Sequence, residues 1–166
     1  RPYRNNMKKQ LILLICLLAG NAVTGQVHTT DEALAFQYFQ NGEYDKAVVL
    51  YKKLYDQKNR TAIYDQYYEA LLKLKAYDEA EQLARRQMQT APGSYMYAVD
   101  LGRVYSEKGD HRKATEWFNR LIADLPPDET AIRDLATNFY RAEAYEMAVR
   151  TFNTGRKLLN NDQAFA

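Results

Sequence analysis

Two histidines and three adjacent pairs of carboxylates are the residues of this sequence best suited to chemistry. His28 and His111 lie about eighty residues apart, and the sequence after residue 26 contains no cysteine. A metal site needs several histidine, cysteine or carboxylate ligands at short spacings. The sequence also lacks a glycine-rich phosphate loop and the GxSxG motif of a nucleophilic serine. We therefore predict no metal site and no cofactor, and we interpret His111 as a structural residue of a turn.

The carboxylate pairs would suit general acid and base catalysis if their surroundings separated the two pKa values. They are Asp31-Glu32, Asp78-Glu79 and Asp128-Glu129. Each pair stands where a helix is expected to begin, and negative charge there stabilises the positive end of the helix dipole by about 0.3 to 1 kcal/mol. We interpret the pairs as structural, predict no catalytic residue, and expect that the protein is not an enzyme.

Length and composition favour one mostly helical globular domain. The chain has 166 residues, 46% of them hydrophobic and 27% charged, with only 7 Gly and 4 Pro. Its net charge is +2, and four basic residues precede residue 26 in a segment without acidic ones: Arg1, Arg4, Lys8 and Lys9. The remaining 19 basic and 21 acidic residues leave a charge of about −2. That balance would not attract nucleic acid, and we expect neither nucleic acid nor a small-molecule substrate as partner.

The first 25 residues have the pattern of a signal peptide. Met7 and two lysines precede an apolar run over residues 11–19, and small or polar residues follow up to Gly25. A spanning helix would need roughly 20 apolar residues, so this run favours secretion instead. We predict a signal peptide over residues 7–25, an upstream remnant over 1–6, and an exported protein, in the first place periplasmic, with secretion or membrane anchoring as alternatives. Contact with a membrane is expected only through an uncleaved signal segment.

A repeat organises the rest of the chain. Four segments align without gaps on Ala47, Ala80, Ala114 and Ala148, which are 33, 34 and 34 residues apart. Each period contains two apolar clusters with spacings of three to four residues, the pattern of two amphipathic helices. Small or polar residues separate the two helices, as at Gly109, and a proline such as Pro126 ends the second helix. Each period therefore predicts helix, turn, helix, turn.

This period resembles the tetratricopeptide repeat, whose pattern is L-G-x2-Y, then G, A, x3-F and P. The third period matches it with Leu101, Gly102, Tyr105, Gly109, Ala114, Phe118 and Pro126. The second period departs at Tyr68 and Ala84, and the fourth carries Gly155 in mid-helix, where glycine weakens a helix by about 1 kcal/mol. The resemblance implies an all-α solenoid of antiparallel helix pairs over residues 28–162. We place its repeats at about 28–60, 61–94, 95–128 and 129–162, with a further helix beginning at 163–166.

The resemblance also implies a concave groove lined by the first helix of each pair, suited to an extended peptide or a partner helix. The family's groove positions correspond here to Glu32, Phe36, Phe39, Asp65, Glu69, Leu72, Lys73, Val99, Arg103, Ser106, Arg133, Thr137, Tyr140 and Arg141. In regular stacking this groove would change from acidic and aromatic to basic and aromatic along the chain. The five positions of the carboxylate clamp that binds chaperone tails are not matched.

Two functions follow from this pattern. The first is a protein-interaction scaffold that binds a peptide or partner helix of unknown identity in the groove. The alternative is a sensory or regulatory arm of a larger enzyme or envelope machine whose active part lies downstream. The groove could also be occupied by the chain's own continuation.

Overall fold

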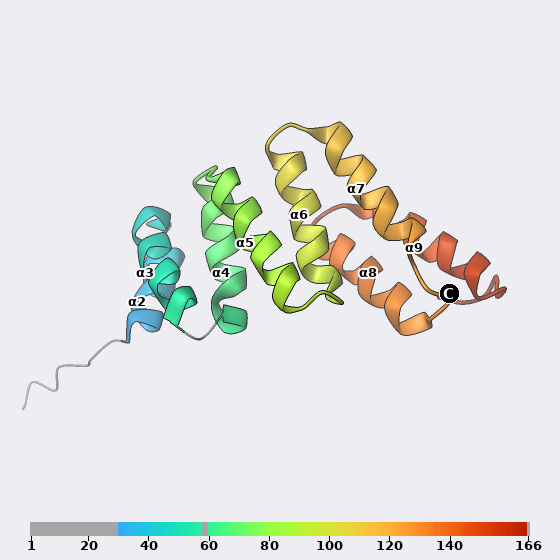
Figure 1. Ribbon diagram of the computed structural model, residues 1–166, viewed down its shortest axis with the longest axis horizontal. Coiled ribbons are helices and arrows are strands. Elements are labelled where there is room, and N and C mark those ends of the chain that lie inside the picture. Colours follow the sequence, from blue (N-terminus) through green and yellow to red (C-terminus); the bar gives the residue numbers. More distant parts are fainter. Residues whose placement is uncertain (1–29, 58–59, 166) are drawn as a thin grey trace, which may run out of the picture. The chain divides into compact units, whose positions relative to one another are not determined.

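The structure is a computed structural model that describes residues 30–57 and 60–165. Over these residues the chain forms eight α-helices and no strand (Figure 1). The helices are α2 (Asp31–Gln40), α3 (Tyr44–Gln57), α4 (Arg60–Lys73), α5 (Tyr77–Thr90), α6 (Tyr95–Glu107), α7 (His111–Ala123), α8 (Glu129–Arg141) and α9 (Tyr145–Leu158). The predicted all-α fold is confirmed. The predicted signal peptide and the upstream remnant lie outside the described residues.

The helices form four pairs, each closed by the same tight turn. The second residue after α2, α4, α6 and α8 has a positive φ, and in chain order these residues are Gly42, Lys75, Gly109 and Glu143. The next amide donates to a carbonyl five residues back, as Asp110 N does to Tyr105 O at 2.9 Å. This pattern ends a helix by satisfying its last carbonyls. Lysine and glutamate adopt the left-handed conformation in two turns, so glycine is favoured there but not required.

We call α2, α4, α6 and α8 the first helices, and α3, α5, α7 and α9 the second helices. Helices α2 and α8 pack mainly against the second helix of their own pair, whereas α4 packs mainly against α3 and α6 packs about equally against α5 and α7. First helices also contact one another, α2 with α4 and α6 with α8, and the second helices α7 and α9 meet as well. These contacts make the described chain an α-solenoid, as predicted.

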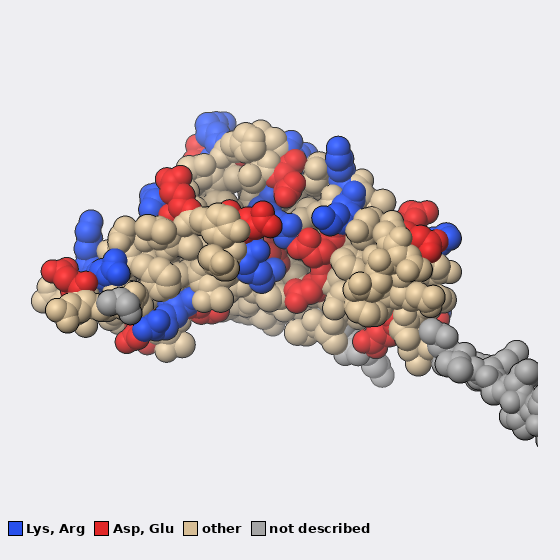
Figure 2. Space-filling model, turned by 180° about the vertical axis from the view of Figure 1, so that it is seen from behind, with Lys and Arg blue, Asp and Glu red and all other residues tan. Residues whose placement is uncertain are grey.

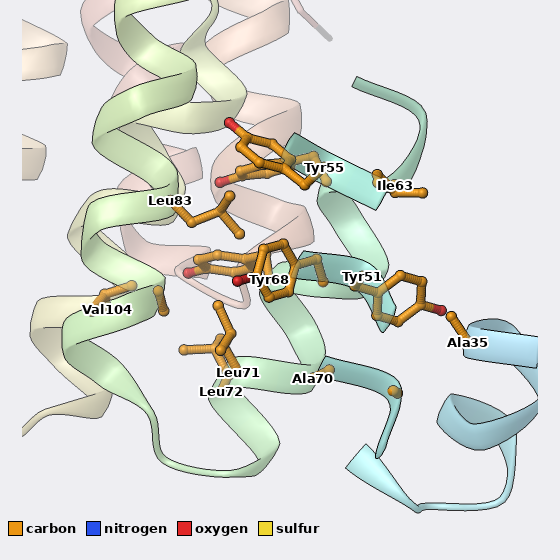
Figure 3. Close-up of a cluster of buried hydrophobic side chains, with 14 of the residues drawn as sticks. Ala35, Tyr51, Tyr55, Ile63, Tyr68, Ala70, Leu71, Leu72, Leu83 and Val104 are labelled. Atoms are coloured by element: carbon orange, nitrogen blue, oxygen red, sulfur yellow. The ribbon is translucent and has the colours of Figure 1, made fainter. Parts of the chain in front are cut away.

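Two clusters of buried side chains form the core. One draws on α2 to α6 and is rich in tyrosine, and the other draws on α5 to α9. Figure 3 shows Tyr51, Tyr55 and Tyr68 of the first cluster among aliphatic side chains such as Leu71 and Leu83. Helices α5 and α6 contribute to both clusters, so neighbouring repeats share one continuous core, as expected of stacked units that cannot bury their apolar faces alone.

Small residues allow the helices to approach closely. A Cβ atom built on Gly102 would lie 2.1 Å from Cε1 of Phe118, so the glycine leaves the space that the phenylalanine ring fills. Gly155 of α9 is buried as well, and a Cβ there would lie 2.6 Å from Cγ2 of Ile132 and 3.0 Å from Cε2 of Phe165. From the sequence, Gly155 is expected only to weaken its helix. In the structure it also leaves room for the side chains of Ile132 and Phe165.

The segment after α9 differs from the prediction. Residues 163–165 form a turn, so the helix expected to begin there is not present in that part of the described chain. Asn161 acts as a local cap, because its Oδ1 accepts a hydrogen bond of 3.1 Å from Gln163 N. The Phe165 ring packs against Phe152 with the ring centroids 5.0 Å apart. The turn therefore folds back onto the last repeat and covers its core.

Candidate functional site

The predicted groove residues lie on the first helices, whose exposed side chains we call the first-helix face. Eight of them are exposed: Glu32, Phe36, Asp65, Lys73, Arg133, Thr137, Tyr140 and Arg141. Four are partly buried: Phe39, Glu69, Arg103 and Ser106. Leu72 and Val99 are only 8% and 0% exposed, because both belong to the core. The assignment of these two residues to the groove is corrected, since a bound partner could not reach them.

A buried polar network joins three first helices. The carboxylate of Asp100 in α6 is 0% exposed, and it accepts hydrogen bonds of 3.0 Å from Tyr64 Oη in α4 and 2.6 Å from Arg141 Nη2 in α8. The backbone carbonyl of Asp100 also accepts from Tyr68 Oη at 2.8 Å. This one residue therefore links the second, third and fourth repeats.

Burial and pairing act in opposite directions on the acidity of Asp100. Burial raises the pKa of its carboxyl, and the charge and hydrogen bond of Arg141 lower it again, which leaves a pKa of about 6. Burial also raises the pKa values of Tyr64 and Tyr68 well above 10, so both phenols stay protonated and can donate. The Asp100 carboxyl at the centre of the network therefore gains or loses its charge as the pH passes through about 6.

Asp100 is not among the groove residues that the sequence predicts. A signal was available, because Asp100 lies one helical turn before Val104, within a run of buried residues on the same helix. A carboxylate at such a position requires a cation or several donors nearby. The identity of the donors depends on tertiary contacts between repeats, so the pattern alone could not name Arg141 or Tyr64.

A second ion pair lies beside the first. Arg103 of α6 pairs with Glu69 of α4 through both terminal guanidinium nitrogens. Nη1 donates to Oε1 of Glu69, and Nη2 lies 3.4 Å from its Oε2. The Nε of Arg103 lies 3.8 Å from Oε1 of Glu107. The guanidinium also lies over the ring of Tyr68, 6.0 Å from its centroid. The side chains of Arg103 and Glu69 are 21% and 31% exposed, so the pair is partly shielded from water.

The basic end of the predicted charge gradient is largely paired. Arg133 Nη2 lies 2.8 Å from Oε1 of Glu129, and its guanidinium lies over the Phe165 ring at 4.9 Å. Arg141 is paired with Asp100. The positive charge that the sequence predicted at this end is therefore compensated by neighbouring carboxylates rather than presented as a basic surface.

Aromatic side chains remain exposed at both ends of the first-helix face. Phe36 is 48% exposed in α2, and Tyr140 is 67% exposed in α8. The Tyr140 ring meets the Tyr145 ring edge to face, at a centroid distance of 5.2 Å and an interplanar angle of 63°. Large exposed aromatic rings of this kind are common at sites of protein contact.

A pocket of about 180 Å³ lies at the carboxyl end of α6. Arg103, Ser106 and Glu107 line it together with Phe118 and the turn before α9. A neighbouring hollow of about 310 Å³ is lined in part by His111 and Tyr145. His111 itself is exposed, opens α7 and has Nδ1 3.4 Å from Ser106 Oγ. The pockets are small and open, which fits side chains of a partner better than an enclosed substrate.

The three carboxylate pairs open helices, as predicted. Asp128 Oδ1 accepts a hydrogen bond of 2.7 Å from Ala131 N and caps α8. Asp31 accepts from Lys53 Nζ at 2.7 Å, and Asp78 accepts from Lys108 Nζ at 2.5 Å.

Within the described residues, no group of three or more His, Cys, Asp or Glu could hold a metal ion. No helix among those residues is long and apolar enough to cross a membrane.

Paired helices, a shared core and a recurring turn define an α-solenoid of helical repeats. The family model described as the tetratricopeptide repeat matches residues 71–139. Over these residues the chain resembles the tetratricopeptide repeat family. Repeats of this family generally support a protein-interaction scaffold, and the fold is typically non-catalytic.

Solved structures of MamA resemble the chain at low identity. One, described as MamA 41-end from Desulfovibrio magneticus RS-1, is 19% identical, with 82% of this chain and 80% of that chain covered and a TM-score of 0.47. Another, MamA AMB-1, is 18% identical, with 81% and 74% covered and a TM-score of 0.47. No curated protein matches the chain significantly.

Proposed function

We propose that the first-helix face binds an extended peptide or a helix of a partner protein. The exposed rings of Phe36 and Tyr140, on first helices at the two ends of this face, carry the proposal. A partner that covered them would remove apolar surface from water at about 25 cal/mol per Å². The polar network between α4, α6 and α8 fixes α8, which presents Tyr140, so little ordering of that helix is needed on binding.

Site-specific photocrosslinking tests this assignment. A photoreactive phenylalanine analogue at Phe36 or Tyr140 is expected to give crosslinked adducts in cells that produce the protein. The matched positions are Val49 and Val149, which are 68% and 59% exposed on the second helices. Adducts from the valine positions and none from the aromatic positions would move the binding site to the opposite face.

We also propose that the protein binds its partner without catalysing a reaction on it, and the same crosslinked adducts test this. The carboxylate pairs support that proposal, because Asp31, Asp78 and Asp128 are engaged in caps or ion pairs at helix starts. Mass spectrometry of the recovered partner is expected to show an intact, unmodified chain. A partner that is cleaved or chemically altered only in the presence of this protein would contradict a purely scaffolding role.

We also propose that the protein is exported to the periplasm, on the basis of residues 7–25 alone. A reporter enzyme that is active only outside the cytoplasm, fused after Ala166, is expected to be active in a Gram-negative host. Deletion of residues 7–25 is the control and should abolish reporter activity. Sequencing of the mature amino terminus should begin at Gln26, and an inactive reporter on the complete chain would contradict export.

A further inference from the structure

The two sets of helices carry opposite net charge. The first helices contain eight acidic and five basic residues. The second helices contain seven acidic and eleven basic residues. The first helices are therefore acidic as a set, and the second helices are basic as a set. On the side of the molecule seen in Figure 2, charges of both signs lie beside one another.

Two arginines of the first-helix face, one in α6 and one in α8, each have more than one carboxylate nearby. Arg103 is paired with Glu69 and also lies within 3.8 Å of Glu107. Arg141 is paired with Asp100. Asp65 is exposed, acts electrostatically on the same arginine and lies in α4 beside this network. The two arginines are therefore occupied, while Asp65 and Glu107 remain exposed to water.

This arrangement selects the charge of a partner. An acidic segment would meet arginines that internal carboxylates already neutralise, and it would be repelled by the remaining carboxylates. A basic segment could place a lysine or arginine beside Asp65 without breaking an internal ion pair. Glu107 could accept a second cation, because its contact with Arg103 is long at 3.8 Å. Complementary charge of this kind raises the rate of association and excludes segments of the wrong sign.

We propose that the segment bound by the first-helix face is basic, with lysine or arginine side chains that contact Asp65 and Glu107. Apolar residues on either side of the basic ones would contact the exposed rings of Phe36 and Tyr140. This inference rests on the proposed function, because it specifies the chemistry of the partner for the same face.

Three peptides of one length test the charge of the partner. They share the same leucines and tyrosines, and their polar positions are all lysine, all glutamine or all glutamate. Fluorescence anisotropy of each labelled peptide with the full chain gives the Kd at low and at physiological salt. The lysine peptide is expected to bind about tenfold more tightly than the glutamine peptide, with the glutamate peptide weakest and the differences reduced by salt.

Paired variants locate the contact. The double variant Asp65→Asn with Glu107→Gln should weaken binding of the lysine peptide about tenfold and leave the glutamine peptide unchanged. The control double variant Glu79→Gln with Glu146→Gln alters the net charge equally, but on the second helices, and should change neither Kd. Circular dichroism of each variant confirms that its helices are retained.

The possible failures can be told apart. A lysine peptide that binds no more tightly than the glutamine peptide overturns the inference, and so does equal weakening in the control variant. If crosslinks at Phe36 and Tyr140 recover acidic segments, the charge inference fails while the proposed function stands. If crosslinks arise only on the second helices, the proposed function fails and the inference fails with it.

Discussion

Arg141 in α8 donates a hydrogen bond of 2.6 Å to the completely buried carboxylate of Asp100 in α6. The arginine side chain is 35% exposed, so it bridges the solvent and the interior of the solenoid. Removal of one partner from a buried ion pair is costly, because the other charge is left without compensation. The contact therefore ties the third repeat to the fourth in a way that depends on the charge of Asp100.

The variant Arg141→Gln should destabilise the protein by about 3 kcal/mol near pH 7.5. Glutamine retains a hydrogen-bond donor but no charge, so the ionised Asp100 loses its counterion. Near pH 5 the loss should be much smaller, because Asp100, with a pKa of about 6 in the intact protein, then binds a proton. Urea unfolding monitored by circular dichroism at both pH values measures the difference.

The direction of this pH effect follows from the raised pKa. Between the ordinary value of 3.8 and about 6, the folded protein holds more protons on Asp100 than the unfolded chain does. The contribution of Asp100 to stability is therefore greatest at low pH and is lost as the pH rises through that window. Arg112→Gln is the control, since Arg112 and its partner Glu116 have side chains that are 86% and 63% exposed. Equal losses for Arg141→Gln at both pH values would contradict the role assigned to Asp100.

The repeat could be predicted because its packing is local. Ala47, Ala80, Ala114 and Ala148 recur at a fixed spacing, and all four are buried, as a small residue in a helix contact must be. The spacing between Gly102 and Phe118 likewise encodes a contact within one helix pair. Contacts that recur in every repeat can be recognised from the sequence, because the same residue types then appear at the same spacing in each repeat.

The candidate site was less predictable because its geometry depends on contacts between repeats. Val99 was placed on the groove by analogy of position, yet it is buried where α6 enters the second core cluster. The pairing of Arg103 with Glu69 and of Arg141 with Asp100 joins residues 34 and 41 positions apart. Those separations are set by how the helices stack, and no local pattern specifies which carboxylate compensates which arginine.

The variant Gly102→Ala should destabilise the protein by about 1 to 3 kcal/mol, because the new methyl group would overlap the Phe118 ring. Helix propensity alone predicts the reverse, since alanine stabilises a helix by about 1 kcal/mol relative to glycine. Thermal and urea unfolding of the variant measures the outcome. In the double variant Gly102→Ala with Phe118→Leu, the smaller side chain should recover part of the loss. A stabilised Gly102→Ala would show that the ring is free to move away.

Two buried tyrosines of α3 should respond differently to the loss of their hydroxyl groups. Tyr55 donates a hydrogen bond of 2.8 Å to Oε1 of the buried Gln87, so Tyr55→Phe should cost about 1 kcal/mol. The Tyr51 hydroxyl is buried and has no hydrogen-bond partner among the described residues, and its ring lies toward Ala35 (Figure 3). Tyr51→Phe should therefore be neutral or slightly stabilising, because it removes a polar group that gains nothing from burial. Urea unfolding of the two variants provides a matched comparison, and equal destabilisation would mean that the Tyr51 hydroxyl is stabilised by an interaction of similar strength.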